Sequence, residues 1–197
     1  MVLTHPGNEK TTVENICPCC GTNVMCVTKS EYNVDNFGSV LMKTTTCQKC
    51  GYKHTDILSL EKNEPTIFRA KISSASDLEI RVVKSGTATI KIPEFGATIT
   101  PGQASEGFIT NVEGVLDRLE DTLTFMLSSA DEKHLKKGRR ILKLIQKSKG
   151  NPCFTFIIED PFGNSRLISS DSSKIKTRNL TNRELQKVKF GLDAVRD

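Results

Sequence analysis

Two short cysteine pairs near the start of this 197-residue chain constrain its fold more than any other feature. Cys17 and Cys20 are separated by two residues, and Cys47 and Cys50 repeat that spacing. In a Cys-x-x-Cys turn the tight backbone directs both sulfurs to one point, and two such turns facing each other supply a tetrahedral cage of four thiolates. The sequence therefore predicts one structural Zn²⁺ ion with these four ligands. The 26 residues between the pairs exceed the roughly 15–20 of the compact pattern and suit two strands and a turn, as in an elongated zinc ribbon.

Other residues offer alternative ligands. Cys19 could replace a neighbour, but the Cys17-x-Cys19 spacing is tighter than the usual knuckle. His54 could in principle replace a thiol. Cys26 lies on an expected strand and is more typical of a packed residue, and Cys153 begins a strand and is interpreted as a small buried hydrophobe.

Composition restricts the class of protein. Six of the seven cysteines lie within residues 17–50, which favours metal binding in a reducing compartment over disulfides. No apolar run approaches the ~20 residues of a membrane-spanning helix, and the N-terminus lacks the pattern of a signal peptide. We therefore expect a soluble, cytoplasmic protein without a membrane partner. The net charge of +5 permits an acidic partner without requiring one.

Hydrophobic periodicity, together with glycine, proline and polar turn residues, divides the chain into segments. We expect a flexible N-terminus (1–13), a three-stranded zinc ribbon (14–60), a linker (61–65), a β-rich domain (66–180) with an inserted helical hairpin (111–149), and a C-terminal helix (181–197). The β-rich domain shows many short alternating strands, with hairpins predicted at Ser85-Gly86 and at 160–164. The predicted fold class is α+β, with a sandwich, jelly roll or distorted β-helix after the ribbon.

Helical periodicity begins at Asn111. One apolar stripe comprises Val112, Val115, Leu116, Leu119, Leu123 and Met126. Ser129 and Glu132 match a capping box that would start the second helix, and Thr181 and Glu184 match another before the C-terminal helix.

The second helix suggests a rival function. Between Asp131 and Lys149 it holds eight basic residues: Lys133, Lys136, Lys137, Arg139, Arg140, Lys143, Lys147 and Lys149. Such a face can follow an RNA backbone, but it is also complementary to an acidic protein surface. Stacking aromatics are absent from this helix, so a protein partner at Lys136, Arg139, Arg140 and Lys143 is the favoured interpretation.

Two further features bear on function. In Asp160-Pro161-Phe162-Gly163-Asn164-Ser165, turn chemistry accounts for every residue except Phe162, which is a candidate contact residue. The sequence shows neither a nucleotide-binding glycine loop nor a nucleophile motif, and four thiolates would leave zinc no open position. We therefore expect no enzymatic activity, no catalytic residue and no small-molecule substrate.

Three stretches together resemble the ZPR-type zinc-finger family. They are the two cysteine knuckles, Ile92–Phe95 through Ile109–Gly114, and Ile158–Ser165, which cover roughly residues 14–170 in the family's order. The resemblance implies a zinc ribbon followed by a double-stranded β-helix-like sheet with a helical hairpin. It also implies a protein partner, translation elongation factor 1-alpha, whose folding and maturation eukaryotic members assist. Eukaryotic members carry this unit twice; the single unit here resembles the shorter archaeal members.

Overall fold

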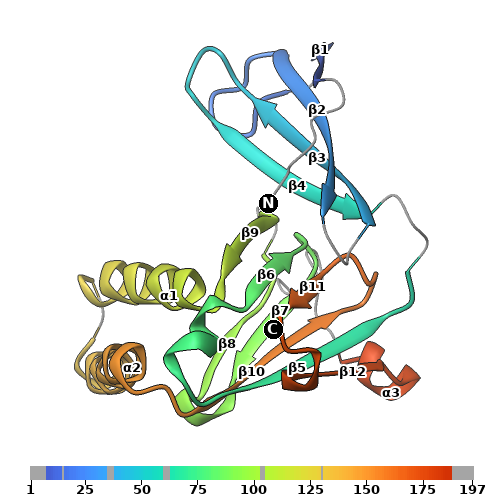
Figure 1. Ribbon diagram of the computed structural model, residues 1–197. Helices are drawn as coiled ribbons and strands as arrows, with labels where there is room; N and C mark the ends of the chain where they lie inside the picture. The colour runs from blue at the N-terminus through green and yellow to red at the C-terminus, as the bar shows by residue number, and fades with distance from the viewer. Residues whose placement is uncertain are drawn as a thin grey trace.

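The computed structural model describes residues 8–14, 16–34, 38–59, 63–102, 105–129 and 131–187. Figure 1 shows two parts, a small N-terminal sheet and a larger β-sandwich that carries a pair of helices on one side. This arrangement confirms the predicted α+β class, with a ribbon before a jelly-roll-like domain.

The N-terminal part is a four-stranded antiparallel sheet in the order β1-β2-β3-β4. Its strands are β1 (Asn8–Glu14), β2 (Val24–Val34), β3 (Gly38–Thr46) and β4 (Lys53–Ser59). We predicted three strands and a flexible segment over 1–13, and for residues 8–13 this was wrong, because β1 pairs with β2 from Asn8 opposite Ser30 to Glu14 opposite Val24. Backbone pairing with a neighbouring strand satisfies amide groups whatever the polarity of the side chains, so the polar composition was misleading. Residues 1–7 lie outside the described part of the chain.

The second part is a sandwich of two antiparallel sheets. One sheet has the strand order β12-β5-β10-β7-β8 and the other has the order β11-β6-β9. The larger sheet comprises β5 (Thr66–Ile72), β7 (Thr89–Ile92), β8 (Ala97–Ile99), β10 (Phe154–Asp160) and β12 (Ile175–Asn179). The smaller sheet comprises β6 (Arg81–Lys84), β9 (Phe108–Asn111) and β11 (Arg166–Ile168). Short 3₁₀ turns follow β5 (Ala75–Glu79) and β7 (Pro93–Phe95) and precede β12 (Ser172–Lys174).

Both hairpins predicted in this domain are wrong. Strand β6 and strand β7, on either side of Ser85-Gly86, belong to different sheets, and so do β10 and β11, on either side of the 160–164 turn. Successive strands of a jelly roll often pass from one sheet to the other, and a short loop with turn residues serves this crossing as well as a hairpin.

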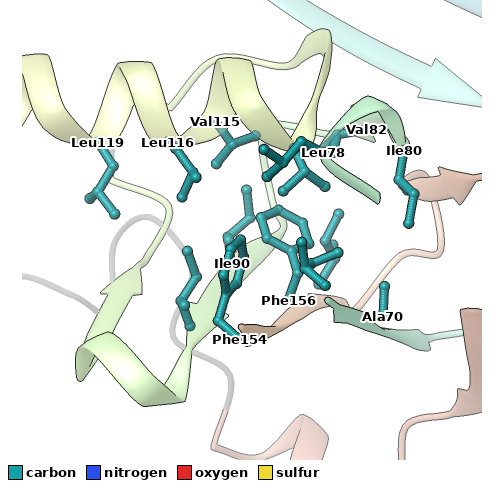
Figure 2. Packing of buried hydrophobic residues seen from close by; sticks show 14 of the residues in the cluster. Ala70, Leu78, Ile80, Val82, Ile90, Val115, Leu116, Leu119, Phe154 and Phe156 are labelled. Carbon is teal, nitrogen blue, oxygen red and sulfur yellow. The ribbon is translucent and has the colours of Figure 1, made fainter. Parts of the chain in front are cut away.

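The main core lies between the sheets and under the helices (Figure 2). Val115, Leu116 and Leu119 of α1 (Val112–Leu127) point toward Ile90 of β7 and Phe156 of β10. All five side chains are buried. Burial of one such side chain stabilises a protein by about 1.5–3 kcal/mol, so this core anchors the first helix on the sandwich.

The two helices form the predicted hairpin, in which α2 (Glu132–Gly150) returns along α1. Lys149 of α2 contacts both Asp117, at 2.6 Å, and Glu120 of α1. The capping box predicted at Ser129 was wrong: Asp131 caps α2 by accepting a hydrogen bond from the His134 amide at 2.9 Å. The apolar stripe is buried through Leu119, but it does not continue to Met126, which is 60% exposed because the tip of the hairpin extends beyond the sandwich.

The C-terminal helix α3 is described over Asn182–Leu185, and its predicted capping box between Thr181 and Glu184 is confirmed. Residues 188–197 of the predicted helix lie outside the described residues. The same holds for residues 61 and 62 of the predicted linker, which falls between β4 and β5.

The ribbon packs on the smaller sheet of the sandwich. Val40 and Ile57 of the ribbon form one buried cluster with Val83 of β6. The approach is close, because the Gly107 amide donates a hydrogen bond to the Thr55 carbonyl at 2.9 Å. A Cβ atom on Gly107 would lie 2.9 Å from the Ile57 backbone nitrogen, so this position requires glycine.

Candidate zinc centre and partner-binding surfaces

The four predicted cysteine ligands meet at one point. The sulfurs of Cys17 and Cys50 are 3.6 Å apart, as are those of Cys20 and Cys47, and all four sulfurs lie within 4.8 Å of one another. Four thiolates at the usual Zn–S distance of about 2.3 Å stand roughly 3.8 Å apart in a tetrahedron. The donor set and its spacing therefore fit a structural zinc ion, and these four residues form the zinc site.

Each knuckle is a turn closed by the same kind of backbone hydrogen bond, from the glycine amide to the carbonyl of the first cysteine. The Gly21 amide donates to the Cys17 carbonyl at 2.9 Å, and the Gly51 amide donates to the Cys47 carbonyl at 2.9 Å. Gly21 and Gly51 have φ values of 69° and 77°, a region that costs other residues energy. The glycine after each second cysteine thus lets the chain turn so that both sulfurs of a pair point the same way.

The electrostatics of the thiols also favour a bound cation. Backbone hydrogen bonding from Cys50 lowers the pKa of the Cys47 thiol to about 7. Although the Tyr52 amide acts in the opposite direction, burial and the three neighbouring thiols raise the pKa of Cys50 to about 12. Cys47 therefore loses its proton readily, and the clustering of the thiols disfavours deprotonation of Cys50. A divalent cation removes the repulsion between thiolates. Because the four cysteines would fill all four of its coordination positions, it acts as a structural ion.

The remaining cysteines lie outside this group. Cys26 is buried, as expected for a packed residue, whereas Cys19 is exposed at the tip of the first knuckle. The interpretation of Cys153 as a buried hydrophobe was wrong, since it is exposed just before β10. His54 lies on β4 opposite Thr45 and is not among the four clustered ligands.

The zinc knuckles lie at the end of the ribbon that is remote from the sandwich (Figure 1). Along β3, Thr46 precedes the second knuckle, whereas Val40 packs toward the sandwich. Six residues of strand correspond to roughly 20 Å. The metal therefore organises the free end of the ribbon, and apolar packing attaches the other end.

The predicted basic face on α2 is exposed. Lys136, Arg139, Arg140 and Lys143, with Leu144 and Lys147, line one groove of about 510 Å³. In the described chain, no acidic side chain lies within 4 Å of the first four. Their charges are thus available to an acidic surface.

The end of α1, at the tip of the hairpin, carries two exposed apolar side chains. Phe125 is 80% exposed and Met126 is 60% exposed. Sequence reasoning missed Phe125, although a signal was present: it lies off the apolar stripe of a helix whose other face packs on the core. Exposed large apolar side chains that lie together are typical of interaction sites.

Phe162 occupies the turn after β10 and is 52% exposed. The turn itself is rigid. The Asp160 carboxylate accepts a hydrogen bond from the Phe162 amide at 2.9 Å, and Gly163 adopts a φ of 67° beside the Glu64 carbonyl. The structure thus bears out the turn chemistry and places the ring of Phe162 at the surface.

Asp160 also anchors a buried network that sequence reasoning did not find. Its completely buried carboxylate accepts hydrogen bonds from the hydroxyls of Ser85 at 2.8 Å and Ser165 at 2.5 Å. Lys84, only 2% exposed, lies nearby and donates to the Ser85 carbonyl at 2.8 Å. Burial lowers the pKa of Lys84 to about 8, against the opposing influence of the Asp160 and Asp56 carboxylates.

A four-thiolate zinc ribbon joined to a jelly-roll sandwich with a helical hairpin defines a class of zinc-finger protein. Residues 76–192 match the ZPR1 jelly-roll domain, and the chain belongs to the ZPR1 family, as the resemblance had predicted.

Comparison with individual relatives agrees with this assignment. An uncharacterized ZPR1-like protein of Pyrococcus horikoshii is 38% identical over 181 residues, which cover 89% of this chain and 80% of the relative. A second, from Methanocaldococcus jannaschii, is 37% identical over 179 residues and 89% of each chain. The zinc finger chaperone zpr1 of Schizosaccharomyces pombe is 29% identical over 169 residues, covering 81% of this chain but only 36% of the relative. Among the helices that the structure describes, none combines the length and apolar character that a bilayer crossing requires.

Proposed function

We propose that this protein is a non-enzymatic, cytoplasmic zinc-binding chaperone that binds translation elongation factor 1-alpha and assists its folding or maturation. The observation that carries the proposal is the helical hairpin, which exposes Phe125 and Met126 near the end of α1 and a basic groove along α2. The relative in S. pombe is named a zinc finger chaperone, and elongation factor 1-alpha is the client that the ZPR-type resemblance implies.

The chemistry of the surface suits a partly folded protein client. Apolar side chains at the tip can enter a hydrophobic pocket that the client still exposes, because each buried large side chain contributes about 1.5–3 kcal/mol. Lys136, Arg139, Arg140 and Lys143 can then orient the client through acidic residues, since charge complementarity sets specificity and association rate. Phe162 is proposed as a further contact.

A non-catalytic role agrees with the zinc site. The four cysteines complete a tetrahedral shell, so the ion has no position for a substrate or an activated water. Relatives in S. pombe and Mus musculus are named as a zinc finger chaperone and a zinc finger protein. We propose that the metal stabilises a platform and does not take part in a reaction.

Binding can be tested with purified components. Nuclease-treated protein and elongation factor 1-alpha from the same source would be titrated by calorimetry, and refolding of the denatured factor would be followed by recovery of guanine-nucleotide binding. We expect the double variant Phe125→Ser, Met126→Ser to lose at least tenfold in affinity and to abolish the gain in refolding. Ile109→Ser is the matched control, because Ile109 is also an exposed apolar residue but lies on β9. Absence of binding by the unaltered protein would refute the proposal.

RNA binding by the helix over residues 131–149 remains a second candidate, favoured by the basic groove alone. It predicts that affinity falls steeply as salt rises and that nuclease removes the bound partner. Charge reversal at Lys136 and Arg140 would then abolish binding, whereas the Phe125 and Met126 variant would retain it.

A further inference from the structure

A basic hollow lies on the outer face of the five-stranded sheet. It has a volume of about 370 Å³, and its lining comes from β5, β10, β12 and the segments that follow β5 and precede β12. The residues of the hollow are Arg69, Lys71, Ser73, Thr155, Ser173, Lys174 and Lys176. Four of the seven are cationic, so the hollow has the composition of an anion site.

The hollow occupies the part of this face that the C-terminal segment leaves uncovered. Ile67 and Ile157 share the face with Arg69, because alternate residues of a strand point to the same side. These two isoleucines are buried together with Leu180, and Leu185 of α3 packs against them. The apolar part of the face is therefore covered, whereas Arg69 and Lys71 are exposed beside it.

Pairing between the strands brings like charges together. Arg69 on β5 lies directly opposite Lys176 on β12, and Lys71 is two residues from Arg69 on the same side. Like charges directly opposite each other destabilise a sheet. In the described chain, no acidic group lies within 4 Å of these three side chains. Lys174 differs from them, because it pairs with Asp77 at 3.1 Å.

The hydroxyls of the hollow are already used as donors to carboxylates. Ser73 donates to Asp77, and Thr155 donates to Glu94. Ser173 likewise donates to Asp171. Asp77 is buried and pairs with Lys174, whereas the carboxylates of Glu94 and Asp171 are exposed near the hollow. A long polyanion that extended past the hollow would meet these two acidic groups, so a compact anion suits the cations better.

We infer that the basic hollow binds a compact phosphate-type anion, such as pyrophosphate or the terminal phosphate of a small molecule, through Arg69, Lys71 and Lys176. Neighbouring strands are about 4.8 Å apart, and alternate residues on one strand are about 6.8 Å apart. A triangle of cations with these spacings can surround one phosphate group. Arg69 can also offer two parallel N–H donors to its oxygens. The bound anion would remove the repulsion between Arg69 and Lys176.

Pyrophosphate titration tests this inference on the full-length, zinc-loaded protein. Calorimetry and thermal unfolding would be run in a phosphate-free buffer, with sodium chloride added to hold ionic strength constant. We expect pyrophosphate to raise the melting temperature, and the Lys176→Gln variant to bind it at least tenfold more weakly. The matched control is Lys29→Gln. Lys29 on β2 also lies opposite a lysine, Lys43 on the neighbouring strand β3, but it is in the ribbon and outside the hollow.

The apo proteins provide a second readout. Without pyrophosphate, Lys176→Gln should melt higher than the unaltered protein, because it removes a like-charge pair, and pyrophosphate should reverse that order. Equal loss of binding in the Lys29→Gln control would show general charge screening and would overturn the inference. So would absence of any effect of pyrophosphate, or tighter binding of an RNA oligonucleotide than of pyrophosphate at equal phosphate concentration with the same dependence on Lys176.

Discussion

Replacement of Asp160 by alanine should strongly destabilise the protein, although the residue lies outside the zinc site. The completely buried carboxylate accepts from the Ser85 hydroxyl at 2.8 Å, the Ser165 hydroxyl at 2.5 Å and the Phe162 amide at 2.9 Å. The Thr87 hydroxyl is a fourth, longer donor at 3.3 Å. Alanine would leave these donors without their acceptor and would remove a negative charge near buried Lys84.

The magnitude follows from the number of donors. Each hydrogen bond to a charged acceptor contributes about 1.5–3 kcal/mol, but hydroxyls can rotate toward other acceptors. The Ser85 hydroxyl has such an alternative, because the Thr87 hydroxyl lies 3.0 Å away. We therefore expect a loss of about 3–5 kcal/mol, in the range for breaking a buried charged network. For a chain of this size the loss lowers the melting temperature by roughly 6–20 °C.

Urea denaturation followed by circular dichroism would measure the free energy of unfolding, and scanning calorimetry would measure the melting temperature. Asp171→Ala is the matched control, because Asp171 also accepts from a serine hydroxyl and a backbone amide but is exposed. Its effect should be small because water replaces the lost contacts. If Asp160→Ala and Asp171→Ala cost the same, the reasoning from burial is refuted.

Three further predictions follow from the fold. Gly163→Ala should destabilise the protein by about 2 kcal/mol or more, because φ is positive and a Cβ would lie 2.4 Å from the Glu64 carbonyl oxygen; Gly150→Ala, with open space around it, should be neutral or stabilising in the same urea titration. Zinc removal by a chelator should increase amide hydrogen exchange at the two knuckles while the sandwich keeps its protection, and equal loss in both parts would contradict separate stabilisation. Because the pKa of Lys84 is lowered to about 8 from 10.5, the folded state favours the neutral amine. Stability relative to Lys84→Met should therefore rise by about 3 kcal/mol between pH 8 and pH 10.5 and stay level below pH 8; a flat difference in urea titrations would contradict it.

Features that depend on local spacing were predictable from the sequence. The ligands Cys17, Cys20, Cys47 and Cys50 form two local turns, so their spacing alone identified them. The helical hairpin was equally accessible, because a stripe such as Val112 to Leu119 fixes both the period and the buried face.

Features that depend on distant partners were not predictable. Ser85-Gly86 has the composition of a hairpin turn, and only the other strands determine that β6 and β7 enter different sheets. Asp160 was correctly interpreted as a turn residue, but its partner Ser85 is 75 positions away in the sequence. Burial of the last helical turn was overestimated at Met126 for a similar reason: periodicity defines a face of a helix but not where the surface beneath it ends.

The close contact of Gly107 with the Ile57 backbone has a consequence for recognition. With no side chain between them, rotation of the ribbon on the sandwich would break the hydrogen bond from the Gly107 amide to the Thr55 carbonyl and separate Val40 and Ile57 from Val83. This packing therefore favours one distance between the knuckles and the hairpin tip. A partner that contacted both the knuckles and the hairpin tip would have to match that distance, so the interface would select partners by their shape.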